Sequence, residues 1–549
     1  MRRLREHLPL VAVLLLAAAA MARAVGFPFL TWDDLSHVVE NPLARHPLAH
    51  GWRALLLQPL IPDQGLPGAN YPIPVTLISY AVDHALSGTH AAFFHAVNVL
   101  LHGCNVALVY LLLLGLGATR STASRATLIF AVHPLVVEPV CWVTGRKDLL
   151  AAGLLLAGAV FLLRGAAADE RPTPARWVGA ELCAMLAMLA KPTAVIAPLF
   201  LGLVVRRRWP GLQVRRIALA LAPLLVGATL WGIHCGAMNI GATARSLASA
   251  ARDIAASYTL QFQHLIWPLG LLPSYPRVGG EPAWWQITAV TATLLLLGVC
   301  TFRLTARGSL ARLGFLLAAT AYLPVSNLVG NLRLVADSYL YLPLVGLGLW
   351  LVSLGEDLWP RALARVARPA WLALAAALGL LAFVQTDVWS SSANVWRPVM
   401  ARHPDQPLPL ARFALGLLHD GQRERAAKAM VLLHQRFPAY DDMICDQAWA
   451  YAALGDRATA TTFLERGVKL RRGECVRVYL SSLMARPHPG PEKAELVRIA
   501  VEEALAHLRP APQQEPYARQ LARLAREAGL EQLAERATAF ARECATPSR

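Results

Sequence analysis

Several motifs that identify soluble nucleotide- and metal-dependent enzymes are absent from this sequence. It contains no glycine-rich phosphate loop, no Walker sequence, no paired Cys-x-x-Cys zinc pattern and no nucleophile elbow. A transporter that hydrolyses nucleotides is therefore disfavoured. We predict no metal ligands and no bound cofactor. The sequence does not decide whether the protein requires a divalent ion.

Charged residues are also scarce. They make up 16% of the 549 residues and hydrophobic residues make up 56%, whereas soluble domains average about 25% and 45–50%. This balance indicates a membrane protein. The formal net charge of +17 comes with arginines grouped in short turns between apolar runs, which the orientation of spanning segments explains better than nucleic-acid binding does. We therefore expect membrane lipid, and no nucleic acid, as a partner.

Only eight cysteines are present, and most lie in or beside apolar runs, where they are expected to be packing residues. Cys445, Cys475 and Cys544 fall instead in the polar C-terminal part. If that part is extracytoplasmic, Cys445 and Cys475 can form a disulfide, which the sequence alone leaves open.

Eleven apolar runs are candidates for membrane-spanning helices. Several are shorter than the roughly 20 residues of a straight span, so some helices are expected to be kinked or partly interfacial. The first run follows three arginines and contains Ala22-Arg23-Ala24 near its end, as in a cleavable signal peptide, but its length favours a retained anchor. The runs lie near residues 8–25, 91–115, 126–143, 147–163, 177–190, 193–205, 215–234, 287–302, 311–326, 338–354 and 369–387.

Arginines are concentrated in every second turn between these runs, which predicts that those turns are cytoplasmic. The alternation holds if the apolar stretch 256–272 is a re-entrant or interfacial helix ended by Pro268 and Pro273. Eleven spans then place the first loop and the C-terminal part outside. The cytoplasmic arginines are Arg120, Arg125, Arg164, Arg171, Arg176, Arg206, Arg207, Arg208, Arg215, Arg216, Arg303, Arg307, Arg312, Arg361, Arg365 and Arg368.

The composition changes after Trp389, where apolar runs shorten and polar residues increase. Gly421 and Gly455 stand in similar Leu- and Ala-rich surroundings 34 residues apart, the period of a tetratricopeptide repeat, and a looser third unit surrounds Gly529. An ordinary helical bundle is the alternative. We predict a membrane domain over 1–397 and a repeat-like helical domain over 398–549.

Two adjacent carboxylates, Asp33 and Asp34, follow the first apolar run. An ionised group beside hydrocarbon loses much of its solvation, so such residues usually have a role. One of them can act as the general base that removes a hydroxyl proton. The alternatives are metal binding and capping of the helix suggested by residues 34–37.

Basic residues also occur on the predicted outer side, against the usual charge bias. A guanidinium beside a spanning helix suits the oxygens of a lipid phosphate, although contact with ordinary phospholipid headgroups is the alternative. These candidates are Arg146, Lys147 and Lys191, with His133, Glu138 and Asp148 as supporting neighbours.

Another outer polar segment, 326–343, contains Arg333, Asp337 and Tyr341. Arg333 and Tyr341 are further candidates for a donor phosphate, while Arg333 can also pair with Asp337 and the tyrosines can belong to an interfacial belt. His95 and His102 share one face of the run 91–115, where a structural hydrogen-bonded seam is favoured over catalysis.

Taken together, these segments resemble the transmembrane and tetratricopeptide-repeat-containing protein O-mannosyltransferases and their bacterial relatives, of the GT-C glycosyltransferase class. The shared motifs extend over almost the whole chain and follow one another in the same order as in that family. It rests on Trp32-Asp33-Asp34 with Asn41-Pro42, YPIPVT (71–76), FFHAVNVLLH (93–102), FAVHPLVVEPVCWVTGRKDLL (130–150), Lys191-Pro192, ADSYLYLP (336–343) and Trp389 with Trp396.

The resemblance implies an all-α polytopic enzyme that transfers a sugar, with mannose as the first expectation, from a polyprenyl-phosphate carrier to a protein hydroxyl, with inversion of the anomeric centre. The acidic motif of the family corresponds to Asp33 and Asp34, and its basic and tyrosine donor contacts to Arg146, Lys147, Arg333 and Tyr341. Two positions depart from the family pattern: Pro192 replaces a frequent glutamate and Ser338 replaces a basic residue.

The leading hypothesis is therefore a bacterial inner-membrane glycosyltransferase whose periplasmic helical repeats recruit an acceptor protein or peptide. A non-catalytic scaffold that assembles envelope complexes through its repeats is the first alternative. A lipid-carrier transporter is the second, but it predicts polar residues through the bilayer centre, whereas here they are concentrated at one face.

Overall fold

The computed structural model describes residues 2–47, 49, 51–58, 71–164, 171–238, 247–276, 283–328, 333–358, 364–484, 493–508 and 514–545. Across these ranges every regular element is helical, which confirms the predicted all-α class. The chain divides into two compact units, residues 1–399 and 400–549.

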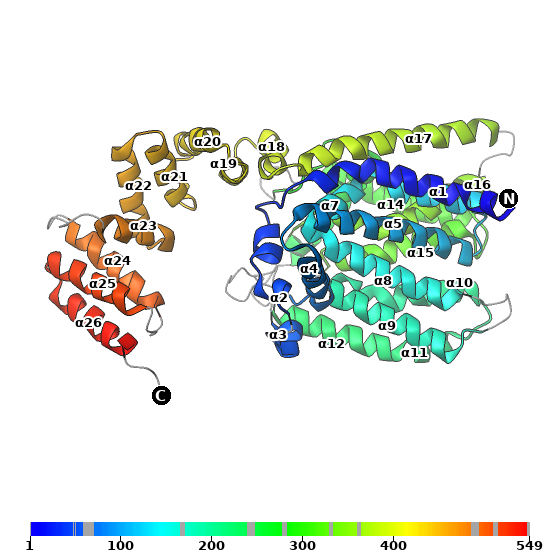
Figure 1. Cartoon of the computed structure of the whole chain (residues 1–549). Coiled ribbons are helices and arrows are strands. Elements are labelled where there is room, and N and C mark those ends of the chain that lie inside the picture. The colour runs from blue at the N-terminus through cyan, green and yellow to red at the C-terminus, as the bar shows by residue number, and fades with distance from the viewer. Residues whose placement is uncertain are drawn as a thin grey trace. The chain divides into compact units, whose positions relative to one another are not determined.

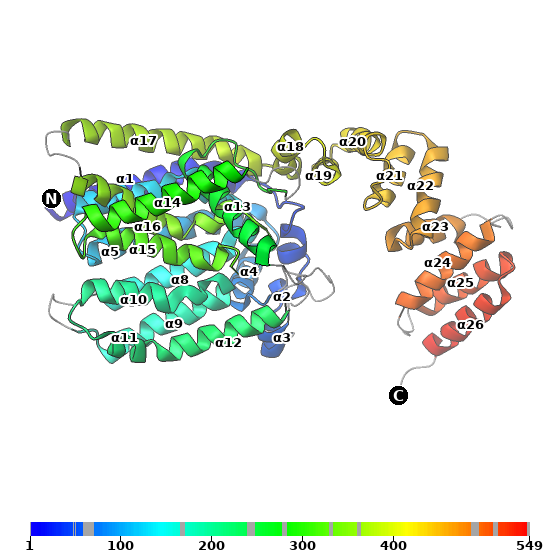
Figure 2. The same ribbon diagram turned by 180° about the vertical axis from the view of Figure 1, so that it is seen from behind.

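The first unit, called the membrane unit below, is a bundle in which the long helices run side by side, as Figures 1 and 2 show from opposite directions. Its helices are α1 (Arg2–Met21), α2 (Pro42–Arg45), α3 (Gly51–Leu57), α4 (Pro74–Ser87), α5 (Ala91–Gly115), α6 (Arg120–Val132), α7 (Val137–Cys141), α8 (Arg146–Leu163), α9 (Pro174–Ala190), α10 (Ala197–Arg208), α11 (Val214–Ala220), α12 (Ala222–Met238), α13 (Leu247–Ile266), α14 (Trp284–Leu304), α15 (Leu310–Tyr322), α16 (Pro343–Leu358), α17 (Ala364–Gln385) and α18 (Ser392–Arg402).

Short 3-10 or π segments join several of these helices. Those used below are η1 (Ala22–Gly26), η2 (Leu35–Val39), η3 (Pro134–Val136), η4 (Val143–Gly145), η5 (Pro192–Ile196), η7 (Asp337–Leu340) and η9 (Thr386–Trp389).

Four helices of the described chain are long and apolar enough to cross a membrane: Leu8–Gly26, Ala91–Gly115, Trp284–Leu304 and Ala370–Trp389. Two bent pairs, α6 with η3–α7 and α11 with α12, raise the count to six. Most other predicted runs form helices of 12 to 18 residues, such as α8, α9, α10 and α16, which is short for a straight span. The count of eleven therefore stays a prediction.

The run predicted as one helix over 126–143 is broken at His133-Pro134. The backbone of α6 and α7 bends there by 56°, and Pro134 lacks the N–H that a continuous helix would need. The Nδ1 atom of His133 accepts a hydrogen bond from the Leu135 N–H at 3.2 Å and caps the new turn. The break directs Glu138 and Trp142 toward loops that come from distant parts of the chain.

Helices α15 and α16 approach each other so closely that glycine is required on both. A Cβ atom on Gly314 would lie 2.7 Å from the Gly346 carbonyl oxygen, and a Cβ atom on Gly346 would lie 2.6 Å from the Gly314 carbonyl oxygen. This contact fixes α16 against α15. The segment η7, which carries Asp337 and Ser338, directly precedes α16.

The second unit consists of helical hairpins. Gly421, Gly455 and Gly529 have φ of 78°, 90° and 73°, and each ends the first helix of a hairpin in the left-handed conformation that glycine adopts without strain. Cys445 and Cys475 form a disulfide between α21 and α23. The helices are α19 (Pro407–His419), α20 (Arg423–Arg436), α21 (Ile444–Ala453), α22 (Arg457–Lys469), α23 (Gly473–Met484), α24 (Ala494–His507), α25 (Glu515–Glu527) and α26 (Glu531–Ala545). Their identity as tetratricopeptide repeats stays a prediction.

Candidate functional site

Asp34 is a buried anchor of the loop between η1 and η2. Its carboxylate accepts hydrogen bonds from the Leu30 N–H at 3.0 Å, the Thr144 N–H at 3.0 Å and the Thr144 hydroxyl at 2.7 Å. Burial raises the pKa of Asp34 to about 6, although these hydrogen bonds oppose the shift. Asp34 makes no side-chain cap on η2, so the capping alternative is wrong, because its oxygens bind elsewhere.

Asp33 presents the more accessible carboxylate of the pair. Its side chain is 29% exposed, and one oxygen lies 3.9 Å from Nδ1 of His37. Burial lowers the pKa of His37 to about 4, and the nearby Lys147 charge lowers it further while Asp33 opposes this. His37 is therefore neutral near pH 7, and the side chains of Asp33 and Lys147 lie near enough to act on it.

Arg333 reaches the same loop from the segment before η7. Its Nη1 donates to Oε1 of Glu138 at 2.7 Å, and its Nη2 donates to the Pro273 carbonyl oxygen at 2.5 Å. The guanidinium carbon lies 5.1 Å from the ring centroid of Trp32, the residue before Asp33. This is a cation–π contact, so Arg333 lies beside the loop of residues 27–34 between η1 and η2, which we call the acidic loop.

Glu138 of α7 connects Arg333 to η7. Its side chain is fully buried, and besides Arg333 its oxygens accept from the Asp337 N–H at 2.9 Å and from the N–H and hydroxyl of Ser338, each at 3.2 Å. The alternative that Arg333 pairs with Asp337 is therefore wrong, because Glu138 takes the guanidinium. Asp337 instead accepts from the Tyr275 hydroxyl at 2.8 Å.

A group of four tryptophans surrounds the acidic loop. The Trp32 ring stacks on the rings of Trp142 and Trp389. The distances between ring centroids are 5.0 Å and 6.0 Å, and the interplanar angles are 17° and 13°. It also lies 5.5 Å from the tilted ring of Trp396. Lys147 Nζ lies 5.3 Å from the Trp142 centroid. Two cations, from Arg333 and Lys147, thus pack against the aromatic group that holds the loop.

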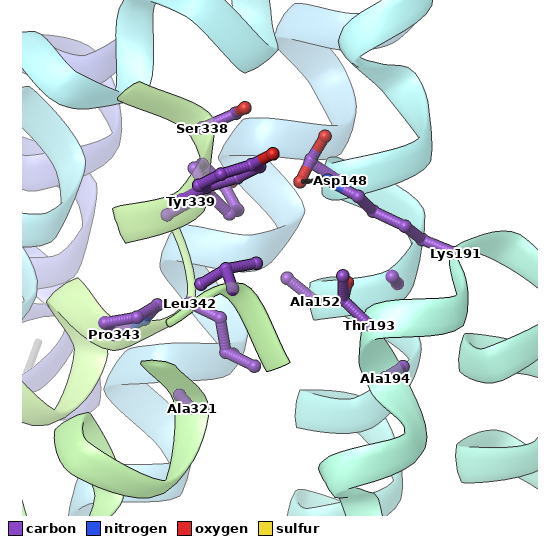
Figure 3. A pocket seen from close by; sticks show the side chains of 13 residues that line it. Asp148, Ala152, Lys191, Thr193, Ala194, Ala321, Ser338, Tyr339, Leu342 and Pro343 are labelled. Atoms are coloured by element: carbon purple, nitrogen blue, oxygen red, sulfur yellow. Dashed lines mark hydrogen bonds and ion pairs between the residues drawn. The ribbon is translucent and has the colours of Figure 1, made fainter. Parts of the chain in front are cut away.

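Lys191 and Asp148 form a buried ion pair at one end of a small cavity of about 40 Å³. Figure 3 shows Lys191 extending toward Asp148, with Tyr339 on the opposite side; the Lys191 ammonium lies 5.8 Å from the Tyr339 centroid. The Tyr339 hydroxyl donates to the Arg333 carbonyl oxygen at 3.1 Å. The other lining residues include four alanines and the hydroxyl side chains of Thr193 and Ser338.

Tyr71 relates this ion pair to the acidic loop. Burial raises the pKa of the Tyr71 phenol, and the charges of Lys191, Asp148 and Asp33 all act on it. Trp32 and Trp142 connect Arg333 and Lys147 to the loop that carries Asp33. Tyr339 connects Lys191 to the Arg333 backbone. The four charged residues come from four separate segments of the sequence.

Arg146 lies elsewhere, in the core. Its guanidinium forms an ion pair with Asp83, donates through Nε to the Asn98 side-chain oxygen at 2.8 Å, and donates through Nη2 to the Phe94 carbonyl oxygen at 2.8 Å. The side chain is fully buried. Lys147, the next residue, is the one that lies beside the acidic loop. The structure therefore favours a structural role for Arg146 over the predicted phosphate contact.

Tyr341 is also committed to internal contacts. Nε2 of His102 lies 3.1 Å from the Ala131 carbonyl oxygen, which requires a proton on Nε2 and leaves Nδ1 as an acceptor. The Tyr341 hydroxyl then donates to Nδ1 at 2.9 Å and accepts from Asn105 at 3.1 Å. His95 likewise bonds the Pro28 carbonyl oxygen at 3.4 Å. These contacts agree with the structural seam preferred for His95 and His102, and His133 is a helix cap.

Several residues of this region were missed by the sequence analysis. Trp142 and Tyr71 lie inside motifs that were quoted without a role for them. Ser392 lies outside every motif quoted above, but its hydroxyl accepts a hydrogen bond from the Thr31 N–H at 3.0 Å. His264, on α13, lies 3.8 Å from an oxygen of Asp337. Among the described residues, no group of three or more His, Cys, Asp or Glu side chains is arranged to hold a metal ion.

The fold and the site define a helical membrane protein with a clustered acidic and basic site, and its similarity to known proteins points the same way. No family model matches the chain. Protein O-mannosyl-transferase Tmtc2 of Drosophila melanogaster is 30% identical over 186 residues, which cover 33% of this chain and 20% of Tmtc2. Protein O-mannosyl-transferase TMTC4 of Mus musculus is 40% identical over 93 residues, which cover 14% of this chain and 13% of TMTC4.

These matches confirm the resemblance to the O-mannosyltransferase family, and they span a fifth or less of each relative's length. Among solved structures, the oligosaccharyltransferase of Archaeoglobus fulgidus tethered with an acceptor peptide has a TM-score of 0.39 at 16% identity, over 69% of this chain and 55% of that chain. At this level of similarity we transfer neither residues nor ligands from it.

Proposed function

We propose that this chain is an inverting membrane glycosyltransferase of the GT-C class, which moves a sugar, mannose in the first instance, from a polyprenyl-phosphate to a protein serine or threonine hydroxyl. The main support is the grouping of an accessible carboxylate, Asp33, with the cations of Lys147 and Arg333 around Trp32. The partial matches to protein O-mannosyl-transferases supply the reaction class.

Each charged group has a place in the reaction. Asp33 accepts the proton of the acceptor hydroxyl while the hydroxyl oxygen attacks the anomeric carbon. The bond between that carbon and the carrier phosphate oxygen breaks, and the released phosphate keeps the electron pair. Lys147 and Arg333 stabilise its negative charge. Attack on the face opposite the phosphate inverts the anomeric centre.

The neighbouring residues support these roles. Asp34 holds the loop through Thr144 and Leu30, and Glu138 orients Arg333. Lys191, paired with Asp148, adds a positive charge next to Tyr339. The proposal further includes eleven spans and a periplasmic second unit, in which the helical hairpins of residues 400–549 would recruit the acceptor as a tetratricopeptide-like array.

Comparison of envelope glycopeptides from cells with and without this protein tests the proposal. Hexose-modified serine and threonine peptides should disappear when the protein is deleted and return when the wild-type chain is supplied. Complementation by a chain with Asp33→Asn should not restore them. An unchanged glycopeptide set in the deletion strain would exclude protein O-glycosylation and favour the scaffold, because a scaffold tolerates substitution of Asp33.

The disulfide in the second unit gives a test of sidedness. Disulfides persist in oxidising compartments and not in the cytosol, so Cys445 and Cys475 should resist a maleimide reagent in intact cells until a reductant is added. Closing this loop of about 30 residues contributes roughly 3–4 kcal/mol to the stability of the unit. A Cys445→Ser/Cys475→Ser chain should therefore be cleaved faster by protease in its second unit.

Buried Cys544 in the same unit is the internal control, because it should remain a thiol throughout. Labelling of Cys445 and Cys475 without reduction, in denatured samples quenched with acid, would contradict the extracytoplasmic placement.

A further inference from the structure

The last segment of the membrane unit contacts the acidic loop directly. The Thr31 N–H donates to the Ser392 hydroxyl at 3.0 Å, although the two residues are 361 positions apart. Ser392 begins α18 and is buried. In Figure 1, η9 and α18 follow the end of α17 next to the blue N-terminal segment that leads into the loop. The chain therefore returns to the acidic loop just before it leaves the membrane unit.

Two tryptophans of this segment extend the contact to Trp32. Trp389 stacks on Trp32 and Trp396 packs against its edge, and both are almost completely buried. A third link is the ion pair between Arg23 and Asp387, with 2.9 Å between Nη2 and Oδ1. We call Asp387, Trp389, Ser392 and Trp396 the clasp.

The acidic loop is thus fixed from two sides. The clasp holds Thr31 and Trp32, and Thr144 of η4 holds Asp34. Asp33 lies between these anchors, and its partly exposed carboxylate lies 3.9 Å from Nδ1 of His37. The position of the Asp33 carboxylate therefore depends on where its two neighbours are held.

We propose that the clasp is a positioning element of the reaction, which sets Asp33 at the distance where it can accept the acceptor proton. This inference rests on the proposed function, because positioning has meaning only if Asp33 is the base. Transfer rates are sensitive to such placement, since a shift of about 1 Å in a reacting group can cost on the order of a hundredfold in rate. The clasp touches neither donor nor acceptor in this scheme, so it should act on kcat and not on KM.

Ser392→Ala is the sharpest test. It removes the acceptor of the Thr31 N–H and keeps the hydrogen bond from the Asn394 N–H to the Ser391 hydroxyl at the start of α18. In purified full-length protein, with mannosyl-phosphate-polyprenol and a serine peptide, kcat should fall about tenfold while both KM values stay within twofold. Ser392→Thr keeps a hydroxyl and should recover most of kcat.

Ser353→Ala is the matched control. It also removes a buried serine hydroxyl, on α16, with no hydrogen-bond partner among the described residues, and it should behave as wild type in kcat and thermal midpoint. Hydrogen exchange supplies a readout independent of turnover: peptides covering residues 27–37 should exchange faster in Ser392→Ala and not in Ser353→Ala. Trp396→Phe should retain more kcat than Trp396→Ala.

The outcomes separate the two proposals. If the wild type transfers sugar and Ser392→Ala has the same kcat, the clasp has no positioning role and the proposed function stands. If Ser392→Ala raises a KM and leaves kcat unchanged, positioning of Asp33 is likewise overturned, because the residue would act on substrate binding. If the wild type transfers no sugar although it binds the carrier, the proposed function fails and the clasp inference fails with it.

Discussion

Replacing Asp33 with asparagine is expected to lower kcat for sugar transfer by roughly 100- to 10,000-fold, the range usually found for a general base. The amide keeps the size of the side chain but cannot accept the hydroxyl proton. Folding should be little affected, because the Asp33 side chain is partly exposed and makes no short ion pair. The measurement is transfer of radiolabelled mannose from a polyprenyl-phosphate to a peptide by purified protein in detergent.

Asp357→Asn, at the exposed end of α16, is the matched control and should keep wild-type kcat. Asp34→Asn should behave differently from Asp33→Asn, since an amide nitrogen in place of one Asp34 oxygen would face a donor, either the Leu30 N–H or Thr144. It should lower the thermal midpoint as well as kcat. Full activity in the Asp33→Asn/Asp34→Asn double variant would remove the catalytic role assigned to this pair.

The candidate residues could be proposed from the sequence, whereas their contacts could not. Arginine alternation predicts one side of the membrane for Asp33, Lys147, Lys191 and Arg333. In the structure, aromatic contacts connect Lys147 and Arg333 to the loop that carries Asp33. The sequence could not show which of Arg146 and Lys147 would be buried. Successive residues of a helix point about 100° apart. One of the two side chains therefore enters the core and the other faces the acidic loop, and the local sequence pattern does not indicate which.

Contacts between distant segments were the other limit. Hydrophobic runs predicted the long helices, but a run by itself does not show that α6 ends at Val132 and that η3 and α7 follow at an angle. The pairing of Glu138 with Arg333 and of Thr31 with Ser392 joins residues 195 and 361 positions apart. Such contacts follow from how the bundle packs, and single-sequence periodicity carries no information about them.

Arg146→Ala is expected to destabilise the membrane unit strongly, by about 3–5 kcal/mol, because it leaves the Asp83 carboxylate buried without its partner. Arg146→Lys should recover little, since an ammonium cannot reach Asp83, Asn98 and the Phe94 carbonyl together. The measurement is thermal unfolding in detergent, followed by intrinsic fluorescence. Arg125→Ala is the matched control: it breaks a partly exposed ion pair with Glu356 and should shift the midpoint little.

Lys147→Ala should show the opposite behaviour, with a wild-type midpoint and a kcat/KM for the carrier lowered about tenfold, which corresponds to roughly 1.4 kcal/mol. Lys428→Ala on α20, an exposed lysine paired with Glu424, should change neither. Combining Arg146→Met with Asp83→Leu should restore part of the lost stability, because removing both charges leaves none unpaired. If Arg146→Ala instead unfolded like wild type and raised the carrier KM, Arg146 would be a phosphate contact after all, and the buried network would be dispensable.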